Sequence, residues 1–118
     1  MSTTTLYGIS NCDTIKKARN WLRDHAIDYQ FHDYRKQGVD AELLQSMAAH
    51  LGWEVMLNRR GTTWRAIAEE EKSEVDEVAA LRLMRASPAL IKRPILAHNG
   101  QFHIAFSEQQ YQEIFDPA

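Results

Sequence analysis

LYGISNCDTIKKARNWL, residues 6–22, contains a change of period that predicts a strand followed by a helix. Residues 3–9 are rich in β-branched and aromatic side chains and end in a Gly-Ile-Ser-Asn turn cluster, which is typical of a strand. From Asp13 onward, Ile15, Ala18 and Leu22 recur at i, i+3 and i+7, the spacing of one buried helix face. Cys12 therefore lies where the strand gives way to the helix.

Cys12 is the only cysteine of the chain, and its position favours a reactive thiolate. A thiol in the first turn of a helix lies near unpaired backbone N–H groups and the positive end of the helix dipole, and both stabilise the thiolate. Lys16, Lys17 and Arg19 add positive charge within two turns. Two observations argue the other way. A lone cysteine is most often a small buried side chain, and Asp13 would raise the pKa of the thiol unless it turned away to cap the helix.

The length of 118 residues predicts a single domain, residues 1–118, that can bury a core without disulfides or metals. The net charge of −2 is spread along the chain, so we expect no general attraction to nucleic acid or to a membrane. The sequence contains neither a signal-peptide pattern nor an apolar run of membrane-spanning length. We therefore expect a cytoplasmic protein, acting as a monomer, whose thiol stays reduced.

A second strand and a helical middle are predicted next. Residues 27–34 carry Ile27, Tyr29, Phe31 and Tyr34, a pattern that indicates a half-buried strand parallel to the first. Residues 41–86 are helical by composition and contain two apolar stripes, of which Gly52 ends the first. The stripes consist of, first, Leu43, Leu44, Met47, Ala48 and Leu51 and, second, Val75, Val78, Leu81, Leu83 and Met84.

The last third of the chain predicts a β-hairpin and a closing helix. Residues 94–98 and 101–106 have strand character and are separated by Asn99 and Gly100, a strong signal for a two-residue hairpin turn. Ser107 is expected to cap a final helix that runs through Ile114.

This order of elements, βαβ then helices then ββα, predicts an α/β protein with a thioredoxin-like fold. A helical insertion, about residues 40–88, would separate the two halves. In such a fold the start of the first helix and the loop before the hairpin meet at one end of the sheet. We therefore expect Cys12 to lie near Arg93 and Pro94.

Three segments together carry a resemblance to a known family: GISNCDTIKKA at residues 8–18, LNRRGTTW at 57–64 and LIKRPI at 90–95. They resemble the ArsC family of thioredoxin-fold proteins, most closely its YffB-like branch, to which the Spx regulators are related. The resemblance covers almost the whole chain. It implies a nucleophile at Cys12, an arginine before a cis-proline at Arg93 and Pro94, and a second anion-binding arginine at Arg60 or Arg59, because the spacing permits either. Further candidates for anion binding flank the cysteine: Asn11, Thr14 and Lys16.

The chain departs from better-known members of this family at three positions. Arsenate reductases that resemble it carry a histidine that helps to ionise the cysteine where this chain has Gly8, and a third oxyanion-binding arginine where it has Ala105. Both departures argue against arsenate reduction. Proteins that resemble Spx generally carry Cys-x-x-Cys, and here the fourth position is Ile15, so one cysteine cannot form an internal disulfide switch.

We expect no metal site, because the five histidines lack paired ligand spacing and a single cysteine offers no thiolate cluster. The sequence also contains no Ser-His-Asp order, phosphate-binding glycine loop or dinucleotide fingerprint.

The resemblance leads us to expect a glutathione-dependent thiol reductase, an oxidoreductase that uses Cys12 alone, binds no resident cofactor and takes glutathione as co-substrate. The thiolate would attack an oxidised or glutathionylated small molecule or protein, and external glutathione would resolve the intermediate. Arg93 and Arg60 or Arg59 would hold carboxylates or an oxyanion, and the backbone beside Pro94 would receive the peptide-like part of the partner. Two alternatives remain: an Spx-like non-catalytic regulator that binds proteins such as RNA polymerase, and a genuine arsenate reductase.

Overall fold

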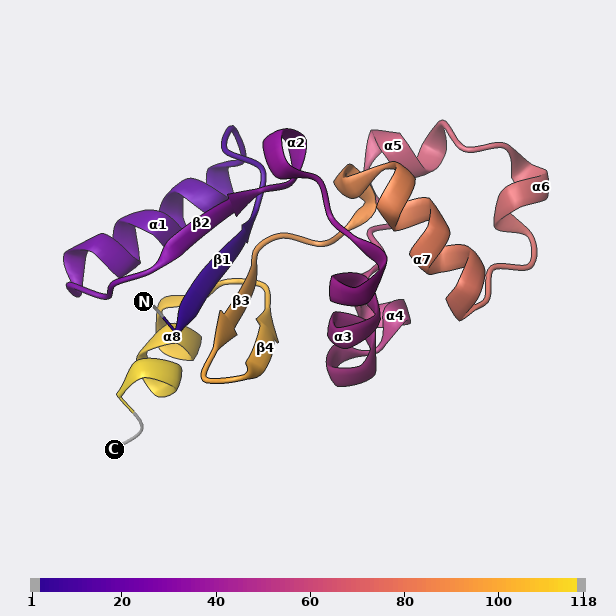
Figure 1. Cartoon of the computed structure of the whole chain (residues 1–118). Coiled ribbons are helices and arrows are strands. Elements are labelled where there is room, and N and C mark those ends of the chain that lie inside the picture. Colours follow the sequence, from indigo (N-terminus) through magenta and orange to yellow (C-terminus); the bar gives the residue numbers. More distant parts are fainter. Residues whose placement is uncertain (1–2, 117–118) are drawn as a thin grey trace. The chain divides into compact units, whose positions relative to one another are not determined.

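The computed structural model describes residues 3–116 and divides the chain into two compact units (Figure 1). The sheet unit is discontinuous in sequence, because it comprises the residues up to Asp33 and those from Arg93 onward. The helical unit is the continuous segment Tyr34–Lys92 between them.

The sheet unit contains a four-stranded sheet in the order β2-β1-β3-β4. Its strands are β1 (Thr4–Gly8), β2 (Gln30–Asp33), β3 (Ile95–His98) and β4 (Gln101–Ile104). β1 runs parallel to β2 and antiparallel to β3, and β3 runs antiparallel to β4. Helix α1 (Asp13–Asp24) connects β1 to β2, and helix α8 (Glu108–Phe115) follows β4. This is the βαβ and ββα arrangement that the sequence predicts for a thioredoxin-like fold.

The core of the sheet unit forms where the predicted face of α1 meets the sheet and α8. Its buried members are Leu6, Ala18, Trp21, Leu22, Leu96 and Tyr111. The rings of Trp21 and Tyr111 meet edge to face with centroids 5.6 Å apart, and Tyr111 meets Phe106 in the same way at 4.7 Å. Such pairs stabilise a core by about 0.5–1.5 kcal/mol beyond their buried area, so aromatic contacts join α1 to α8.

Close packing at the end of β1 fixes the start of α1. Gly8 is buried, and a Cβ atom at this position would lie 2.8 Å from Cγ1 of the fully buried Ile15 and closer still to its Cδ1. Real Cβ atoms essentially never approach another carbon this closely. The absence of a side chain at Gly8 therefore lets the first turn of α1 pack onto the end of the strand.

The hairpin and the final cap follow the sequence prediction. Asn99 and Gly100 have φ values of +52° and +79°, the left-handed backbone that a type I′ turn requires at both central positions. The hydroxyl oxygen of Ser107 accepts a hydrogen bond from the N–H of Gln110 at 3.0 Å, which caps α8.

The helical unit consists of short helices and one 3₁₀ turn. They are α2 (Tyr34–Gln37), α3 (Ala41–Leu51), α4 (Trp53–Met56), α5 (Thr62–Arg65), α6 (Glu69–Lys72), α7 (Glu77–Ala86) and η1 (Pro88–Leu90). Asp40 caps α3 by accepting the N–H of Leu43 at 2.8 Å, and Gly52, with φ +89°, ends that helix as predicted. Asp76 caps α7 by accepting the N–H of Ala79 at 2.9 Å.

The helical unit contains the predicted insertion of about residues 40–88 and runs from Tyr34 to Lys92, whose N–H donates to the carbonyl of Met56 at 2.8 Å. Two expectations for single residues are wrong. Tyr34 begins α2 instead of ending a strand. Val78 was expected in an apolar stripe but is 73% exposed. It lies two residues, or about 200° around the helix axis, from the buried Ala80. None of the helices within residues 3–116 is long and apolar enough to cross a membrane.

Candidate active site

Cys12 occupies the N-cap position of α1. Its backbone is extended, with φ −91° and ψ 131°, its N–H donates to the carbonyl of Ile9 at 3.2 Å, and its carbonyl accepts the N–H of Lys16 at 3.0 Å. These two hydrogen bonds hold the residue between the end of β1 and the first turn of the helix. The side chain is half-buried, so the sulfur is accessible, and it makes no regular capping hydrogen bond.

The surroundings of Cys12 favour the thiolate. Burial raises the pKa of the thiol, but the backbone N–H groups of Ile15 and Thr14, together with the charge and hydrogen bonding of Arg93, lower it, and the pKa is lowered overall. N–H groups of the first helical turn have no carbonyl partner within the helix and can stabilise a thiolate, which is the physical basis for reactive cysteines at this position. Asp13, which could have opposed this effect, is exposed.

Arg93 reaches Cys12 from the loop that precedes β3. Arg93 is half-buried, the peptide bond between it and Pro94 is cis, and Pro94 is buried. The carbonyl of Pro94 accepts a hydrogen bond from the N–H of Ala105 at 3.0 Å, which connects this loop to the end of the hairpin opposite its turn. The predicted meeting of Cys12 and Arg93 at one end of the sheet is confirmed.

The structure gives a reason for Gly8, one of the two positions at which the chain was expected to depart from arsenate reductases. Gly8 has no room for a side chain, as described above, so a histidine cannot take its place without moving Ile15. Ala105 is exposed and has a left-handed φ of +69°, and it follows β4 directly. Neither position supplies a cation to the candidate site.

The remaining arginine candidates belong to the helical unit and differ in their local contacts. The guanidinium carbon of Arg59 lies 6.0 Å from the ring centroid of Trp53 and 5.8 Å from that of Trp64, distances at which cation–π attraction operates. Arg60 is exposed, and its backbone N–H donates to Oδ1 of Asn58 at 3.1 Å. The structure thus groups Cys12, Thr14 and Arg93 within one unit, and it gives Arg59 aromatic partners within the other.

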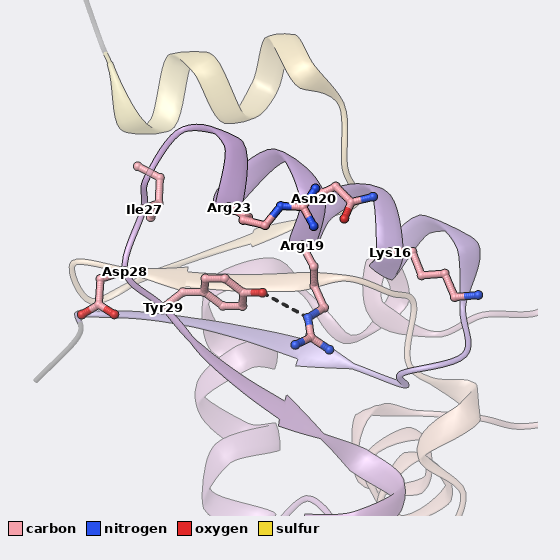
Figure 2. A pocket seen from close by; sticks show the side chains of 7 residues that line it. All are labelled: Lys16, Arg19, Asn20, Arg23, Ile27, Asp28 and Tyr29. Carbon is pink, nitrogen blue, oxygen red and sulfur yellow. Dashed lines mark hydrogen bonds between the residues drawn. The ribbon is translucent and has the colours of Figure 1, made fainter.

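The sheet unit also contains a groove that the sequence did not predict as a site (Figure 2). Its volume is about 570 Å³ and it lies between α1 and the segment that leads into β2. Its lining residues are Lys16, Arg19, Asn20, Arg23, Ile27, Asp28 and Tyr29. The recurrence of cations at residues 16, 19 and 23 could have indicated it. In the described part of the chain, no group of three or more His, Cys, Asp and Glu side chains could hold a metal ion.

We predict that Cys12 reacts as a low-pKa thiol, because the N–H groups of Thr14 and Ile15 and the Arg93 cation lower its pKa. Only the thiolate reacts, so the alkylation rate should rise with pH and then reach a plateau. The midpoint of this rise should lie below the value of about 8.5 for a free cysteine. The rate of iodoacetamide labelling across the pH range measures this midpoint, and a short cysteine peptide serves as the reference. A midpoint at or above the reference would contradict the assignment of Cys12 as nucleophile.

Known proteins match this chain over most of its length. A model of the ArsC family matches residues 7–114. The chain belongs to the ArsC family. An uncharacterised protein from Haemophilus influenzae is 46% identical over 111 residues, covering 94% of this chain and 97% of that protein. Two solved structures are similar at comparable identity. The YffB protein is 47% identical with a TM-score of 0.89, covering 92% of this chain and 96% of its own. An arsenate reductase (ArsC) related protein from Brucella melitensis is 50% identical with a TM-score of 0.76, covering 98% and 96%.

Other similar proteins are a transcriptional regulator and an arsenate reductase. The global transcriptional regulator Spx of Streptococcus pyogenes is 25% identical over 108 residues, covering 90% of this chain and 80% of that protein. An arsenate reductase from Vibrio cholerae has a TM-score of 0.82 at 22% identity, covering 97% of this chain and 99% of its own, which shows a shared fold. The chain is thus similar in sequence to a named regulator and shares its fold with a named reductase.

Proposed function

We propose that this ArsC-family chain is a cytoplasmic, glutathione-dependent thiol reductase whose nucleophile is Cys12. The observation that carries the proposal is the convergence of two backbone N–H groups and the Arg93 cation on one accessible sulfur, which lowers the pKa of the thiol. A cysteine with a purely structural role does not need to be ionised. A cysteine that attacks a disulfide must be a thiolate.

The reaction consists of two thiol–disulfide exchanges. The Cys12 thiolate attacks the glutathione sulfur of a mixed disulfide R–S–SG, a bond forms between Cys12 Sγ and that sulfur, and R–S⁻ leaves. A glutathione thiolate then attacks the glutathione sulfur on Cys12, which releases oxidised glutathione and restores the Cys12 thiolate. Over the cycle R–S–SG and one glutathione thiolate become R–S⁻ and oxidised glutathione, so the sulfur of R is reduced and the sulfur of the incoming glutathione is oxidised. One protein cysteine suffices, because the second thiol comes from glutathione.

The surrounding groups support an anionic, peptide-like co-substrate. The planar guanidinium of Arg93 can pair with a glutathione carboxylate in the two-point geometry that arginine favours. Pro94 has no N–H, and its carbonyl already accepts the N–H of Ala105. A peptide that binds as an extra strand would therefore pair with the backbone of Arg93 and not with that of Pro94. Asn11 and Lys16 flank the thiol in sequence, and both residues are exposed.

The direct test is mass spectrometry of the protein after exposure to oxidised glutathione. We expect one glutathione adduct per chain, located at Cys12, that free glutathione removes. Cys12→Ser is the matched control and should give no adduct. In parallel, amide shifts on titration with reduced glutathione should change at residues 11–14 and 92–95. If no adduct forms, or if the shifts avoid both segments, the proposed function is wrong.

We predict that arsenate is a poor substrate. An oxyanion that loses one of three cationic partners loses charge-assisted hydrogen bonds worth about 1.5–3 kcal/mol, and Ala105 supplies no cation. Gly8 likewise supplies no histidine to ionise the thiol. The measurement is arsenate turnover coupled to glutathione and glutaredoxin, with the glutathione adduct reaction as the positive control. Efficient turnover would restore the arsenate reductase interpretation.

The similarity to Spx favours one further candidate function, a regulator that acts by binding a protein. An unreactive Cys12 in a correctly folded chain would distinguish this regulator from the proposed reductase. Such a protein should bind its partner equally well with Cys12→Ser, whereas the reductase should lose all exchange chemistry.

A further inference from the structure

We propose that the groove beside α1 binds an acidic segment of a protein substrate whose oxidised cysteine reacts at Cys12. The proposal rests on the proposed function and names its substrate class: a mixed disulfide between glutathione and a protein cysteine that has carboxylates a few residues away. The groove contains no part of the Cys12 turn itself, so it is a separate recognition surface on the same unit.

The cations of the groove lie in line with the thiol. Cys12, Lys16, Arg19 and Arg23 follow one another at i, i+4, i+7 and i+11, which places all four within about 40° of the Cys12 direction around the axis of α1. At a rise of 1.5 Å per residue, the three cations lie about 6, 10 and 16 Å along the helix from the cysteine. Figure 2 shows Lys16, Arg19 and Arg23 in this order along α1. A ligand bound at the thiol can therefore continue along this row.

Arg19 is held in a fixed orientation at the middle of the row. Its Nε donates to the hydroxyl oxygen of Tyr29 at 3.0 Å (Figure 2). Its guanidinium carbon lies 4.4 Å from the ring centroid of Phe31. These contacts set the plane of the guanidinium and leave its terminal amino groups for a carboxylate, which arginine binds in a fork geometry. An arginine that is oriented in advance loses less conformational freedom when it binds a ligand.

The charge of the groove favours an anion. Lys16, Arg19 and Arg23 contribute three positive charges, against Asp28 within the groove and Asp24 beside it. Arg23 pairs with Asp24 at 3.3 Å, but both side chains are more than half exposed, so this ion pair is weak and a ligand carboxylate can compete with it. Lys16 and Arg19 lie away from the C-terminal turn of α1 and gain nothing from the helix dipole, whereas Arg23 lies in that last turn, where the dipole favours a cation.

The distances from Cys12 to the cations along α1 favour a peptide substrate over glutathione alone. Glutathione has one residue on each side of its cysteine, so its carboxylates can reach the first of these cations but not the third. An extended chain advances about 3.3–3.6 Å per residue. A substrate carboxylate must therefore lie about three to five residues from the reacting cysteine to meet Arg19 and Arg23. This requirement can be met only by a longer peptide or a protein.

Two synthetic peptides test the proposal. Each carries one cysteine as a mixed disulfide with glutathione, and they differ only in having Glu or Gln at the third, fourth and fifth positions after it. The measured quantity is the rate of glutathione transfer to Cys12, followed by mass spectrometry at low ionic strength. We expect the acidic peptide to react faster by about two- to fivefold for each charge pair formed, and the ratio to fall towards one in 0.5 M salt. Equal rates at low salt would overturn the proposal.

Variants of the protein locate the effect. Arg19→Gln and Arg23→Gln should each lower the acidic-to-neutral rate ratio. Lys17→Gln removes the same charge about 140° around the helix from Cys12 and should leave the ratio unchanged. Tyr29→Phe keeps every charge and removes only the hydrogen bond that orients Arg19, so it should cause a smaller decrease. A ratio that falls equally in Lys17→Gln would show a general charge effect and would overturn the assignment of the groove.

A binding measurement separates this inference from the proposed function. The Cys12→Ser protein is titrated with the acidic peptide carrying serine in place of cysteine, so no exchange can occur. Amide shifts at Arg19, Arg23 and Tyr29 support the groove whether or not Cys12 is a reductase, and their absence excludes it. Failure of every disulfide to modify wild-type Cys12 would instead remove the proposed function.

Discussion

Replacing Arg93 by alanine should weaken glutathione binding about ten- to hundredfold, because it removes a charge-assisted contact of about 1.5–3 kcal/mol. The same change should raise the pKa of Cys12, since Arg93 lowers that pKa through its charge and its hydrogen bonding. At neutral pH less thiolate would then be present, and both alkylation and adduct formation should slow. The free energy of unfolding should change little, because Arg93 contributes to the site and is only half-buried. Calorimetric titration with glutathione and thermal unfolding, measured side by side, provide the comparison.

Arg93→Lys is the matched control for charge. Lysine keeps the positive charge but loses the planar fork, so it should restore most of the lowered thiol pKa and only part of the glutathione affinity. A large loss of stability with unchanged binding in Arg93→Ala would mean that Arg93 is structural. The candidate site would then be reduced to Cys12 and the N–H groups of Thr14 and Ile15.

Replacing Gly8 by alanine should destabilise the sheet unit by about 1–3 kcal/mol, the usual cost of forcing extra volume into a packed core. The new Cβ would collide with Ile15, which is fully buried and cannot swing into solvent. The first turn of α1 would have to shift, and that turn supplies the N–H groups that lower the pKa of Cys12. Denaturant unfolding should therefore show a lower midpoint, and the alkylation midpoint of Cys12 should move upward.

A second substitution at Ile15 tests whether the collision is the cause. Ile15→Val removes the Cδ1 atom and should by itself cost about 0.5–1.5 kcal/mol. Combined with Gly8→Ala it should recover stability, so that the double variant is less destabilised than the sum of the two. Simple additivity of the two free-energy changes would show that Gly8 is needed for another reason.

Local patterns in the sequence predicted the elements that carry strong periodicity or a specific turn residue. The helix face of Ile15, Ala18 and Leu22, the Asn99-Gly100 turn and the Ser107 cap all appear where expected, because each depends on neighbours within a few residues. The meeting of Cys12 and Arg93 followed from the order of the elements, since the topology of the fold brings the start of the first helix to the loop before the hairpin.

Features that depend on tertiary context could not be predicted in this way. The four-residue helices α4, α5 and α6 are too short for a periodic pattern to be visible. Val78 is apolar, but its identity does not show whether it lies on the buried or the exposed face of its helix. The collision that excludes a side chain at Gly8 involves the exact placement of Ile15. The groove was not predicted, because its cations were interpreted as support for the Cys12 thiolate and the contacts of Arg19 with Tyr29 and Phe31 join residues 10 and 12 positions apart.

The split of the sheet unit into two separated segments has a consequence for biosynthesis. Cys12 leaves the ribosome early, but Arg93 and strand β3, which pairs with β1, are made about 80 residues later. Until then β1 and α1 lack half of their sheet, whereas the helical unit is continuous and already fully translated. We therefore expect a nascent chain to carry a cysteine of ordinary reactivity. Its activation would require the synthesis of Arg93 and β3, so a chain that stops before them would not engage disulfides as the folded protein does.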